Sequence, residues 1–245
     1  MRRTSGLVAF LVALGLATTA LPVPAAGQVL ATQVIGTSVQ GRPITAYRIG
    51  EPASPVAAVF IGGIHGNEAQ PSKILLNLIS GPVVRGAAIW VVPRMNPDGV
   101  VHQRRTNAHG VDLNRNFPVD WVRQPAPYYS GPGPASEPET RAVLRFLRSV
   151  DPDYVAVLHQ PLYGVDDSYA KAHSFAYRLS QGLHLPRKVF RCNSVCRGTL
   201  TQWFNSTQPG QALTVEYGST VTTYQETVTG PTGLLRAIGA TRKPQ

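Results

Sequence analysis

The sequence predicts an α/β fold: a mostly parallel mixed sheet with helices on both faces. Short continuous apolar runs, typical of strands that are buried on both faces, recur along the chain. Segments with apolar residues at helical spacing lie between these runs, and such alternation is typical of βα units. With 245 residues, 43% of them hydrophobic, the chain is long enough for one well-packed domain and too short for two large ones.

The start of the chain has the pattern of an export signal. Arg2 and Arg3 precede a short apolar stretch, and a small-residue cleavage site follows at Ala25. We therefore predict a signal peptide over residues 1–25 and a single domain over residues 26–245. The mature protein is expected to be secreted, periplasmic or associated with the cell wall. It has no other segment apolar enough to form a stable membrane span.

In the first half of the chain, a hairpin precedes a strand–helix–strand unit. Loose alternation predicts two antiparallel strands, Val34-Ile35 and Ile44–Tyr47, at an edge of the sheet. The apolar run Val56–Ile61 predicts a buried strand. Helical spacing over Gln70–Ile79 and a further apolar run over Ala88–Val92 complete the unit.

The middle of the chain is irregular. Pro93–Gly99 is dense in turn formers, and Val100–Gly133 has little periodicity and much Arg, Asn, Pro and Tyr. A loop of this length in a compact domain is usually functional. Ser136 followed three residues later by Glu139 predicts a capping box at the start of the next helix, which is expected to end at Asp151.

The second half alternates strands and helices again, and we see no internal repeat or linker. The expected elements are a buried strand over Tyr154–Leu158, a helix over Tyr169–Leu183, a short helix over Leu200–Phe204, a strand over Ala212–Val215 and a C-terminal helix that includes Leu234–Ile238.

The composition limits the possible partners. The formal net charge is +10 and the sequence pI is near 10.1, which favours anionic partners of any kind. The arginines are scattered, without a basic run or interleaved aromatic residues, so no nucleic-acid partner is predicted. A polyanionic wall and an acidic peptide fit equally well. The two cysteines, Cys192 and Cys196, predict a small local disulfide in an exported protein.

Three predicted strands end in residues that bind metals or transfer protons. His65 and Glu68 follow the buried strand Val56–Ile61, His159 follows the buried strand Tyr154–Leu158, and Glu216 follows the strand Ala212–Val215. The carboxyl edge of an open α/β sheet is where ligands bind. Two His and one Glu form the ligand set of a catalytic zinc site with an open fourth position. A further Glu beside that position could act as a general base.

A second group of candidates lies in the long loop. Arg105 precedes the stretch Gly110–Pro118, which contains Asn114 and Arg115. A guanidinium binds a substrate's free carboxylate well because it donates two parallel hydrogen bonds. A second Arg near the metal could stabilise a developing oxyanion. A solvated Arg-rich loop explains the same residues, and their spacing alone does not decide between the two interpretations.

Taken together, several blocks of the sequence closely resemble the zinc carboxypeptidase family. The principal blocks are Gly62-Gly63-Ile64-His65-Gly66-Asn67-Glu68, Asn96-Pro97-Asp98-Gly99, Arg105-Thr106-Asn107-Ala108 and Gly110 to Pro118. Further blocks agree with the bacterial branch that acts on murein peptides: Ser136 to Thr140, Leu158 to Leu162 and Leu213 to Glu216. All of them occur in family order.

The resemblance implies a role for each candidate. His65, Glu68 and His159 correspond to the ligands of one Zn²⁺, and Glu216 to the general base. Arg105 corresponds to the residue that stabilises the oxyanion. Asn114 and Arg115 correspond to the pair that binds the terminal carboxylate. The family often has a substrate-capping Tyr upstream of the base, but no Tyr lies between Cys196 and Glu216, and none is assigned that role. Trp203 is better explained as a core aromatic than as a pocket residue.

The main hypothesis is a secreted zinc metallopeptidase that acts on a peptide substrate, with murein peptides as a candidate. It would be either a carboxypeptidase or an amidase that cuts the γ-D-glutamyl–diaminopimelate bond, and both would use the same metal, base and carboxylate site. An alternative is an acylamino-acid deacylase of the aspartoacylase type, which shares the G-G-x-H-G-N-E start and the D-L-N-R block. A non-catalytic wall-binding module ranks last, because neither a ligand nor the base is missing.

Overall fold

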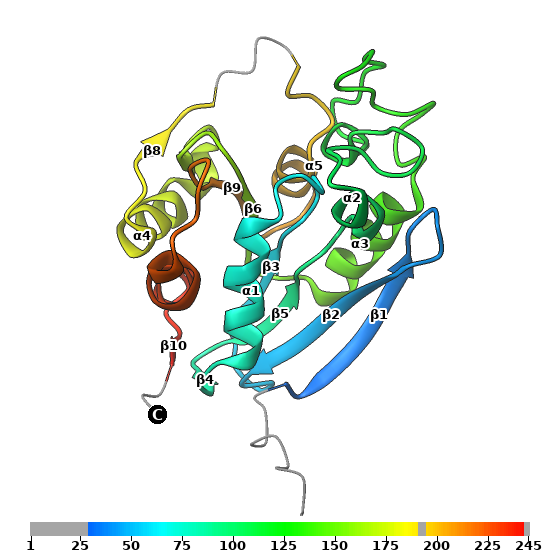
Figure 1. Cartoon of the computed structure of the whole chain (residues 1–245). Coiled ribbons are helices and arrows are strands. Elements are labelled where there is room, and N and C mark those ends of the chain that lie inside the picture. The colour runs from blue at the N-terminus through cyan, green and yellow to red at the C-terminus, as the bar shows by residue number, and fades with distance from the viewer. Residues whose placement is uncertain (1–28, 191–194, 243–245) are drawn as a thin grey trace, which may run out of the picture.

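The computed structural model describes residues 29–190 and 195–242, and a mixed sheet forms the centre of this part of the chain (Figure 1). The predicted signal peptide lies outside the described residues. The strands of the sheet are β1 (Ala31–Thr37), β2 (Pro43–Gly50), β3 (Ala57–Ile61), β5 (Ala88–Val92), β6 (Tyr154–His159), β7 (Gly164–Asp166), β8 (Arg187–Lys188) and β9 (Gln211–Glu216).

The order of the eight strands is β1-β2-β5-β3-β6-β9-β7-β8. The central strands β5, β3, β6 and β9 run parallel, as continuous apolar runs predict. The hairpin β1–β2 adds to the β5 side in antiparallel orientation. On the other side, β7 runs antiparallel to β9 and parallel to β8. The predicted mixed sheet with a hairpin at its edge is therefore confirmed.

Helices cover both faces of the sheet (Figure 1). They are α1 (Gln70–Ser80), α2 (Pro97–His102), α3 (Pro138–Val150), α4 (His173–Leu183), α5 (Leu200–Thr207) and α6 (Gly230–Ala237). Shorter turns are η1 (Leu113–Arg115), η2 (Ala170–Ala172) and the π-helical η3 (Gln225–Thr229), and a separate two-stranded sheet pairs β4 (Val84–Arg85) with β10 (Thr241–Arg242). Among the described residues, no helix combines the length and the apolarity needed to cross a bilayer.

Alternate residues of the central strands divide the core into two layers. Ala58 and Phe60 of β3 pack with α1, α4 and α6, whereas Val59 and Ile61 pack with α3 and α5. Burial on both faces explains why this strand is apolar throughout. Trp203 of α5 is 1% exposed and lies 6.0 Å from Phe117 between ring centroids, so its assignment to the core is confirmed.

The predicted capping box at the start of α3 is wrong. The N-cap residue is Glu137, and its side chain makes no capping hydrogen bond. The hydroxyl of Ser136 donates to Oε1 of Glu137 instead, at 2.7 Å. Glu139 is fully buried and accepts hydrogen bonds from the amide of Val39 and the side chain of Asn107. Contacts with distant parts of the chain therefore use the groups that a capping box would need.

The turn expected over Pro93–Gly99 contains the start of α2. The side chain of Asn96 accepts a hydrogen bond from the amide of Gly99, at 2.9 Å, and caps this helix. Asn and Pro favour a turn and a helix start equally, which is why the local sequence did not reveal α2. The rest of the segment up to Gly133 is largely irregular, as predicted.

Candidate active site

The candidate ligands and base meet at the carboxyl ends of three adjacent parallel strands. Ile61 ends β3 and is paired in register with Val157 of β6. Two residues further along β6, His159 is paired with Glu216 of β9. Because parallel strands end at the same edge of a sheet, the register alone brings these segments together.

Backbone contacts fix the turn that follows β3. The amides of Met95 and Asn96 donate to the carbonyl oxygens of Gly62 and Gly63, both at 2.9 Å. A Cβ atom at Gly66 would collide with the backbone of Gly99, at the start of α2. The absence of a side chain at position 66 therefore lets the turn lie directly against α2, with His65 and Glu68 on either side of the contact.

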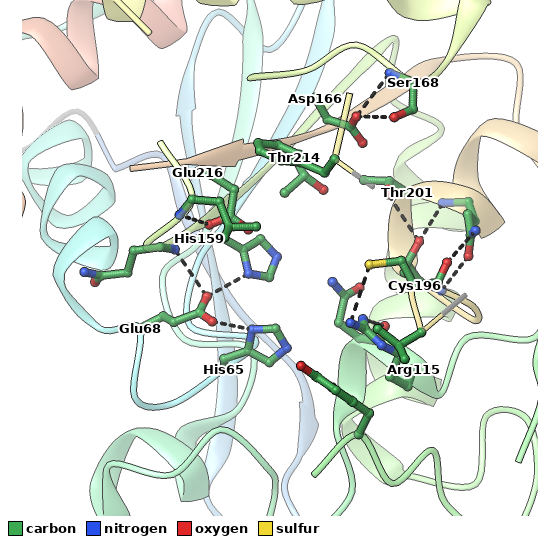
Figure 2. Close-up of a pocket in the computed structure, with 18 of the residues that line it drawn as sticks. His65, Glu68, Arg115, His159, Asp166, Ser168, Cys196, Thr201, Thr214 and Glu216 are labelled. Carbon is green, nitrogen blue, oxygen red and sulfur yellow. Dashed lines mark hydrogen bonds and ion pairs between the residues drawn. The ribbon is translucent and has the colours of Figure 1, made fainter. Parts of the chain in front are cut away.

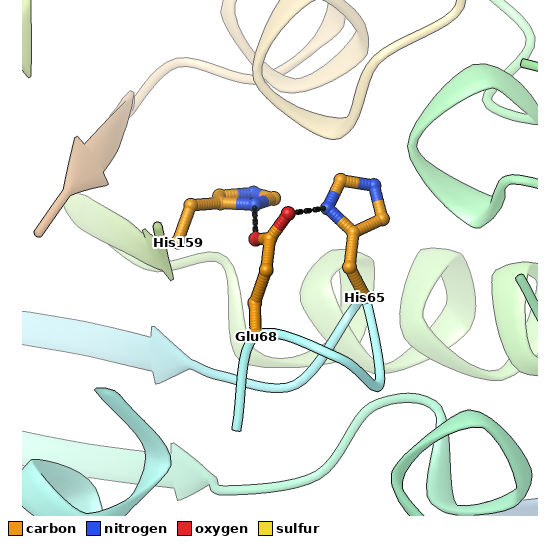
Figure 3. A group of neighbouring side chains, drawn as sticks. All are labelled: His65, Glu68 and His159. Atoms are coloured by element: carbon orange, nitrogen blue, oxygen red, sulfur yellow. Dashed lines mark hydrogen bonds and ion pairs between the residues drawn. The ribbon is translucent and has the colours of Figure 1, made fainter. Parts of the chain in front are cut away.

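His65, Glu68 and His159 form a compact buried group (Figure 3). Nδ1 of His65 lies 2.8 Å from Oε1 of Glu68, and Nδ1 of His159 lies 2.8 Å from Oε2 of the same carboxylate. One donor atom from each residue lies within 4.8 Å of the other two. Two imidazole nitrogens and a carboxylate oxygen are donors that zinc accepts, and three ligands leave one position open. The residues therefore fit a catalytic zinc ion.

The electrostatics of this group also suit a cation. Burial raises the pKa of Glu68, but the two histidines outweigh burial and hold that pKa well below its usual range. Burial lowers the pKa of His65, but Asp112 and Glu68 outweigh burial and raise it. Positive charge on the histidines therefore stabilises the carboxylates of Glu68 and Asp112. A divalent metal supplies such charge in place of protons.

Asp112, to which the sequence analysis gave no role, holds the other side of His65. Its Oδ1 lies 2.9 Å from Nε2 of His65 and accepts a hydrogen bond from the amide of Asn114 at 3.0 Å. Its Oδ2 accepts a hydrogen bond from Nε of Arg105 at 2.9 Å. A carboxylate on the far ring nitrogen orients a ligating imidazole. The only local signal for this residue is an acid between the apolar Val111 and Leu113.

Glu216 lies beside the metal group with its carboxylate largely buried. Oε2 accepts a hydrogen bond from the amide of Leu162, at 3.3 Å. Burial raises the pKa of Glu216, and the negative charge of Glu68 adds to the increase. A carboxylate with a raised pKa is a stronger base, which suits the predicted role.

Arg105, Asn114 and Arg115 line the same cavity as the metal group. Arg105 also donates from Nη1 to Oε1 of Glu68, at 3.3 Å. Nη1 of Arg115 donates to the carbonyl oxygen of Asn114 at 2.7 Å, and its Nη2 lies 3.6 Å from Sγ of Cys196. The side chain of Asn114 accepts a hydrogen bond from the amide of Leu200 at 3.0 Å, which ties it to the start of α5.

Tyrosines that the sequence analysis did not assign also face this cavity. The guanidinium carbons of Arg105 and Arg115 lie 5.5 Å and 5.4 Å from the ring centroid of Tyr128, so one aromatic ring contacts both cations. Tyr169 lines the cavity and lies 3.4 Å from the hydroxyl of Thr201. Tyr128 belongs to the long irregular loop, where no periodicity indicates which side chains point inward.

The cavity measures about 790 Å³ and extends from the metal group to Asp166 and Thr201 (Figure 2). Cys196 forms part of its wall and is disulfide-bonded. Cys192 is the other cysteine of the chain and lies outside the described residues. A cavity of this size holds a ligand of several residues or a drug-sized molecule.

Comparison with known proteins decides the family. The model of a family described as zinc carboxypeptidase matches residues 25–226, which is most of the chain. The chain belongs to the zinc carboxypeptidase family. Members are hydrolases whose metal is zinc, and the group of His65, Glu68 and His159 fits that metal. The family match also favours the peptidase hypothesis over the deacylase and the non-catalytic module.

Relatives within the zinc carboxypeptidases include murein peptide amidase A of Escherichia coli K12. It is 30% identical over 169 residues, which cover 63% of this chain and 69% of the amidase. Carboxypeptidase SOL1 of Arabidopsis thaliana is 30% identical over 141 residues, which cover 51% of this chain. The matched part spans only 28% of the length of SOL1.

Solved structures of zinc carboxypeptidases share the fold. The murein-tripeptide amidase of Escherichia coli O157 superposes with a TM-score of 0.68 at 26% identity, over 84% of this chain and 92% of that one. Carboxypeptidase A of Helicoverpa armigera superposes with a TM-score of 0.71 over 86% of this chain and 69% of that one. The identity to the second is 17%, so it supports the fold alone.

Proposed function

We propose that this zinc carboxypeptidase hydrolyses the peptide or amide bond that precedes a C-terminal, carboxylate-bearing residue, with murein peptides as its substrates. The observation that carries the proposal is that one cavity contains the metal group, a buried carboxylate and two arginines. The similarity to murein peptide amidase A supports the substrate class. The basic character of the chain suits an anionic wall.

In this proposal each side chain contributes to one step. His65, Glu68 and His159 would hold the zinc ion, which as a Lewis acid polarises the scissile carbonyl and makes water more acidic. Glu216 takes the proton of the attacking water and passes it to the leaving amine. Arg105 donates hydrogen bonds to the developing oxyanion. Arg115 and Asn114 bind the terminal carboxylate, which fixes the bond to be cut.

Activity of the zinc-loaded protein tests this proposal. The panel consists of γ-D-glutamyl–diaminopimelate peptides, peptides with basic, acidic and aromatic C-termini, and N-acetylated amino acids. We expect release of the C-terminal residue from at least one peptide class. The Glu216→Gln variant is expected to lose on the order of 10² to 10⁴ in kcat and to keep its zinc, because the base contributes only to proton transfer.

Two results would overturn the proposal. One is hydrolysis of N-acetylated amino acids without hydrolysis of any peptide, which would support the deacylase alternative. The other is a native fold with bound zinc and no activity on the whole panel. The comparison of γ-D-glutamyl peptides with ordinary C-termini separates the amidase from the carboxypeptidase.

Export is part of the same proposal. It rests on the charged, apolar and small-residue pattern that ends at Ala25. Mass spectrometry of protein recovered outside the cytoplasm of the producing cell should give an N-terminus at Ala26. Recovery of the uncut chain in the cytoplasm alone would contradict export.

A further inference from the structure

Tyr128 contacts both arginines of the active-site cavity, and the mechanism above does not use it. Its half-buried side chain forms part of the cavity wall. The guanidinium carbons of Arg105 and Arg115 lie over its ring, at 5.5 Å and 5.4 Å from the ring centroid. Both distances are within the range of about 6 Å over which an aromatic ring attracts a cation. One ring therefore attracts the group that would stabilise the oxyanion and the group that would bind the terminal carboxylate.

Backbone contacts next to Tyr128 fix the position of its ring. The carbonyl oxygen of Tyr129 accepts a hydrogen bond from the amide of Asp112, at 2.8 Å. The carbonyl oxygen of Ser130 accepts one from Nδ2 of Asn116, also at 2.8 Å. Asp112 and Asn116 are the two residues that flank η1. The irregular loop is thus fastened to the turn that carries one of the two arginines.

The two arginines lie close enough to disfavour each other's charge. Burial lowers the pKa of Arg115; Asp112 opposes this decrease, whereas the positive charge of Arg105 adds to it. Arg115 is 4% exposed, so water screens its charge poorly. An aromatic ring offsets the repulsion without neutralising either cation. A carboxylate in its place would instead compete with the carboxylate of the substrate for the same guanidinium.

Burial alone does not order both side chains. The side chain of Arg105 is 28% exposed, and a long side chain with that much freedom loses entropy when a ligand fixes it. A contact that orders the guanidinium before the substrate arrives removes part of this cost. The ring of Tyr128 makes such a contact with Arg105 and with Arg115 at once.

We propose that Tyr128 is a positioning residue whose ring holds Arg105 and Arg115 in the arrangement that receives the oxyanion and the terminal carboxylate. It acts through the two arginines, and the contacts that carry this role are those of the ring and not of the hydroxyl. The proposal rests on the proposed function and adds a residue to the same site.

Substitution of the ring provides the first test. In the zinc-loaded protein, Tyr128→Leu should raise KM and lower kcat by about 3- to 10-fold each, because it loosens a carboxylate contact and a transition-state contact. Tyr128→Phe keeps the ring and should stay within about 2-fold on both constants. The matched control is Tyr177→Leu, which removes an exposed ring that lies 5.7 Å from the guanidinium of Arg187. It should change neither constant.

Fluorinated phenylalanines at position 128 separate the charge of the ring from its shape. Each fluorine withdraws electron density from the ring faces with little change in size, so the attraction for a cation falls stepwise. From phenylalanine through its monofluoro, difluoro and trifluoro forms, kcat/KM should fall at each step, by about 3- to 10-fold in all. A purely structural role would not produce this trend. An equal kcat/KM throughout the series would overturn the proposed contact with the cations.

Binding without turnover separates this proposal from the proposed function. In the zinc-loaded Glu216→Gln variant, titration calorimetry compares each peptide of the panel above with its C-terminal amide. We expect the free carboxylate to bind at least about 10-fold more tightly, because it gains a charged hydrogen bond. Adding Tyr128→Leu should reduce this preference about 3- to 10-fold, and adding Tyr128→Phe should preserve it.

The outcomes are distinct. Hydrolysis by the wild-type protein, with kinetics and carboxylate preference unaltered in Tyr128→Leu, would overturn the role of Tyr128 and leave the proposed function intact. Absence of hydrolysis of every peptide, with a carboxylate preference that Tyr128→Leu reduces, would overturn the proposed function alone. Absence of both hydrolysis and preference would overturn both. Equal losses in Tyr128→Leu and Tyr128→Phe would assign the effect to the hydroxyl and overturn the role of the ring.

Discussion

At the scale of single residues, Asp112 connects the parts of the active site. Its two oxygen atoms contact a metal-group histidine, the guanidinium of Arg105 and the backbone of Asn114. The sequence identified His65 from its place after a buried strand, and it assigned roles to Arg105 and Asn114 through the resemblance to the zinc carboxypeptidase family. It gave Asp112 and Tyr128 no role, because no local pattern in the irregular loop indicates their contacts with His65, Arg105 and Arg115.

Replacement of Asp112 by Asn should weaken metal binding. The amide keeps the size of the side chain but removes the charge that orients and polarises His65, and such changes cost about 10- to 100-fold in metal affinity. Competition with a chelator of known affinity measures the change. Asp120→Asn, which breaks an exposed ion pair with Arg197, is the control and should leave zinc affinity unchanged. An unaltered affinity in Asp112→Asn would contradict the orienting role.

At the scale of elements, the side chain of Asp98 connects α2 to the β1–β2 hairpin. Asp98 of α2 accepts hydrogen bonds from the hydroxyl of Ser38 at 2.8 Å and the amide of Gln40 at 3.0 Å, and it pairs with Arg42 at 2.6 Å. The sequence predicted both strands of the hairpin but not this contact. Its capping-box prediction failed for the same reason, because Glu139 also turns towards the hairpin, where it accepts from Val39.

The contact at Asp98 predicts a pH-dependent loss of stability. Burial raises the pKa of Asp98, but Gln40, Arg42 and Ser38 outweigh burial and leave that pKa lowered. A lowered folded-state pKa stabilises the protein above the unfolded-state pKa of about 3.9, and this contribution is lost as the pH falls through the folded-state value. Asp98→Asn should therefore reduce the free energy of unfolding by about 2 kcal/mol at pH 7 and by less near pH 3.

Urea unfolding at the two pH values measures this difference. Glu51→Gln, which removes an exposed partner of Arg85, is the matched control and should not change the unfolding midpoint at pH 7 detectably. An equal deficit of Asp98→Asn at both pH values would show that shape, rather than charge, fastens the hairpin.

At the scale of the whole molecule, the strand register assembles the metal group. Alternation of apolar runs and helical spacing sufficed to predict the central strands, the edge hairpin and the covering helices other than α2. The short strands β4, β7, β8 and β10 were missed, because segments of two or three residues have no period to detect. The missed strand β7 ends at Asp166, which lines the active-site cavity, so part of the cavity wall comes from an element that the sequence did not predict.

Removal of zinc should destabilise the domain as a whole. The metal binds the folded state, and at a free concentration of about 1,000 times Kd this binding contributes about 4 kcal/mol. For a chain of this length, the melting temperature should fall on the order of 10 °C after chelation and recover when zinc is restored. Calorimetry with and without a chelator measures the shift. An unchanged melting temperature, with metal content shown to differ, would contradict metal binding by this group.

The close approach of Gly66 and Gly99 limits which substitutions the chain can accept. These glycines come from two sequence motifs separated by more than thirty positions, and the backbone of one occupies the space that a Cβ of the other would fill. A side chain at position 66 would meet the main chain of residue 99, so no substitution at position 99 can make room for it. The two motifs are thus a single unit for protein engineering. Libraries that diversify this cavity should leave both positions fixed and place their variation on β7 and the loop that carries Tyr128.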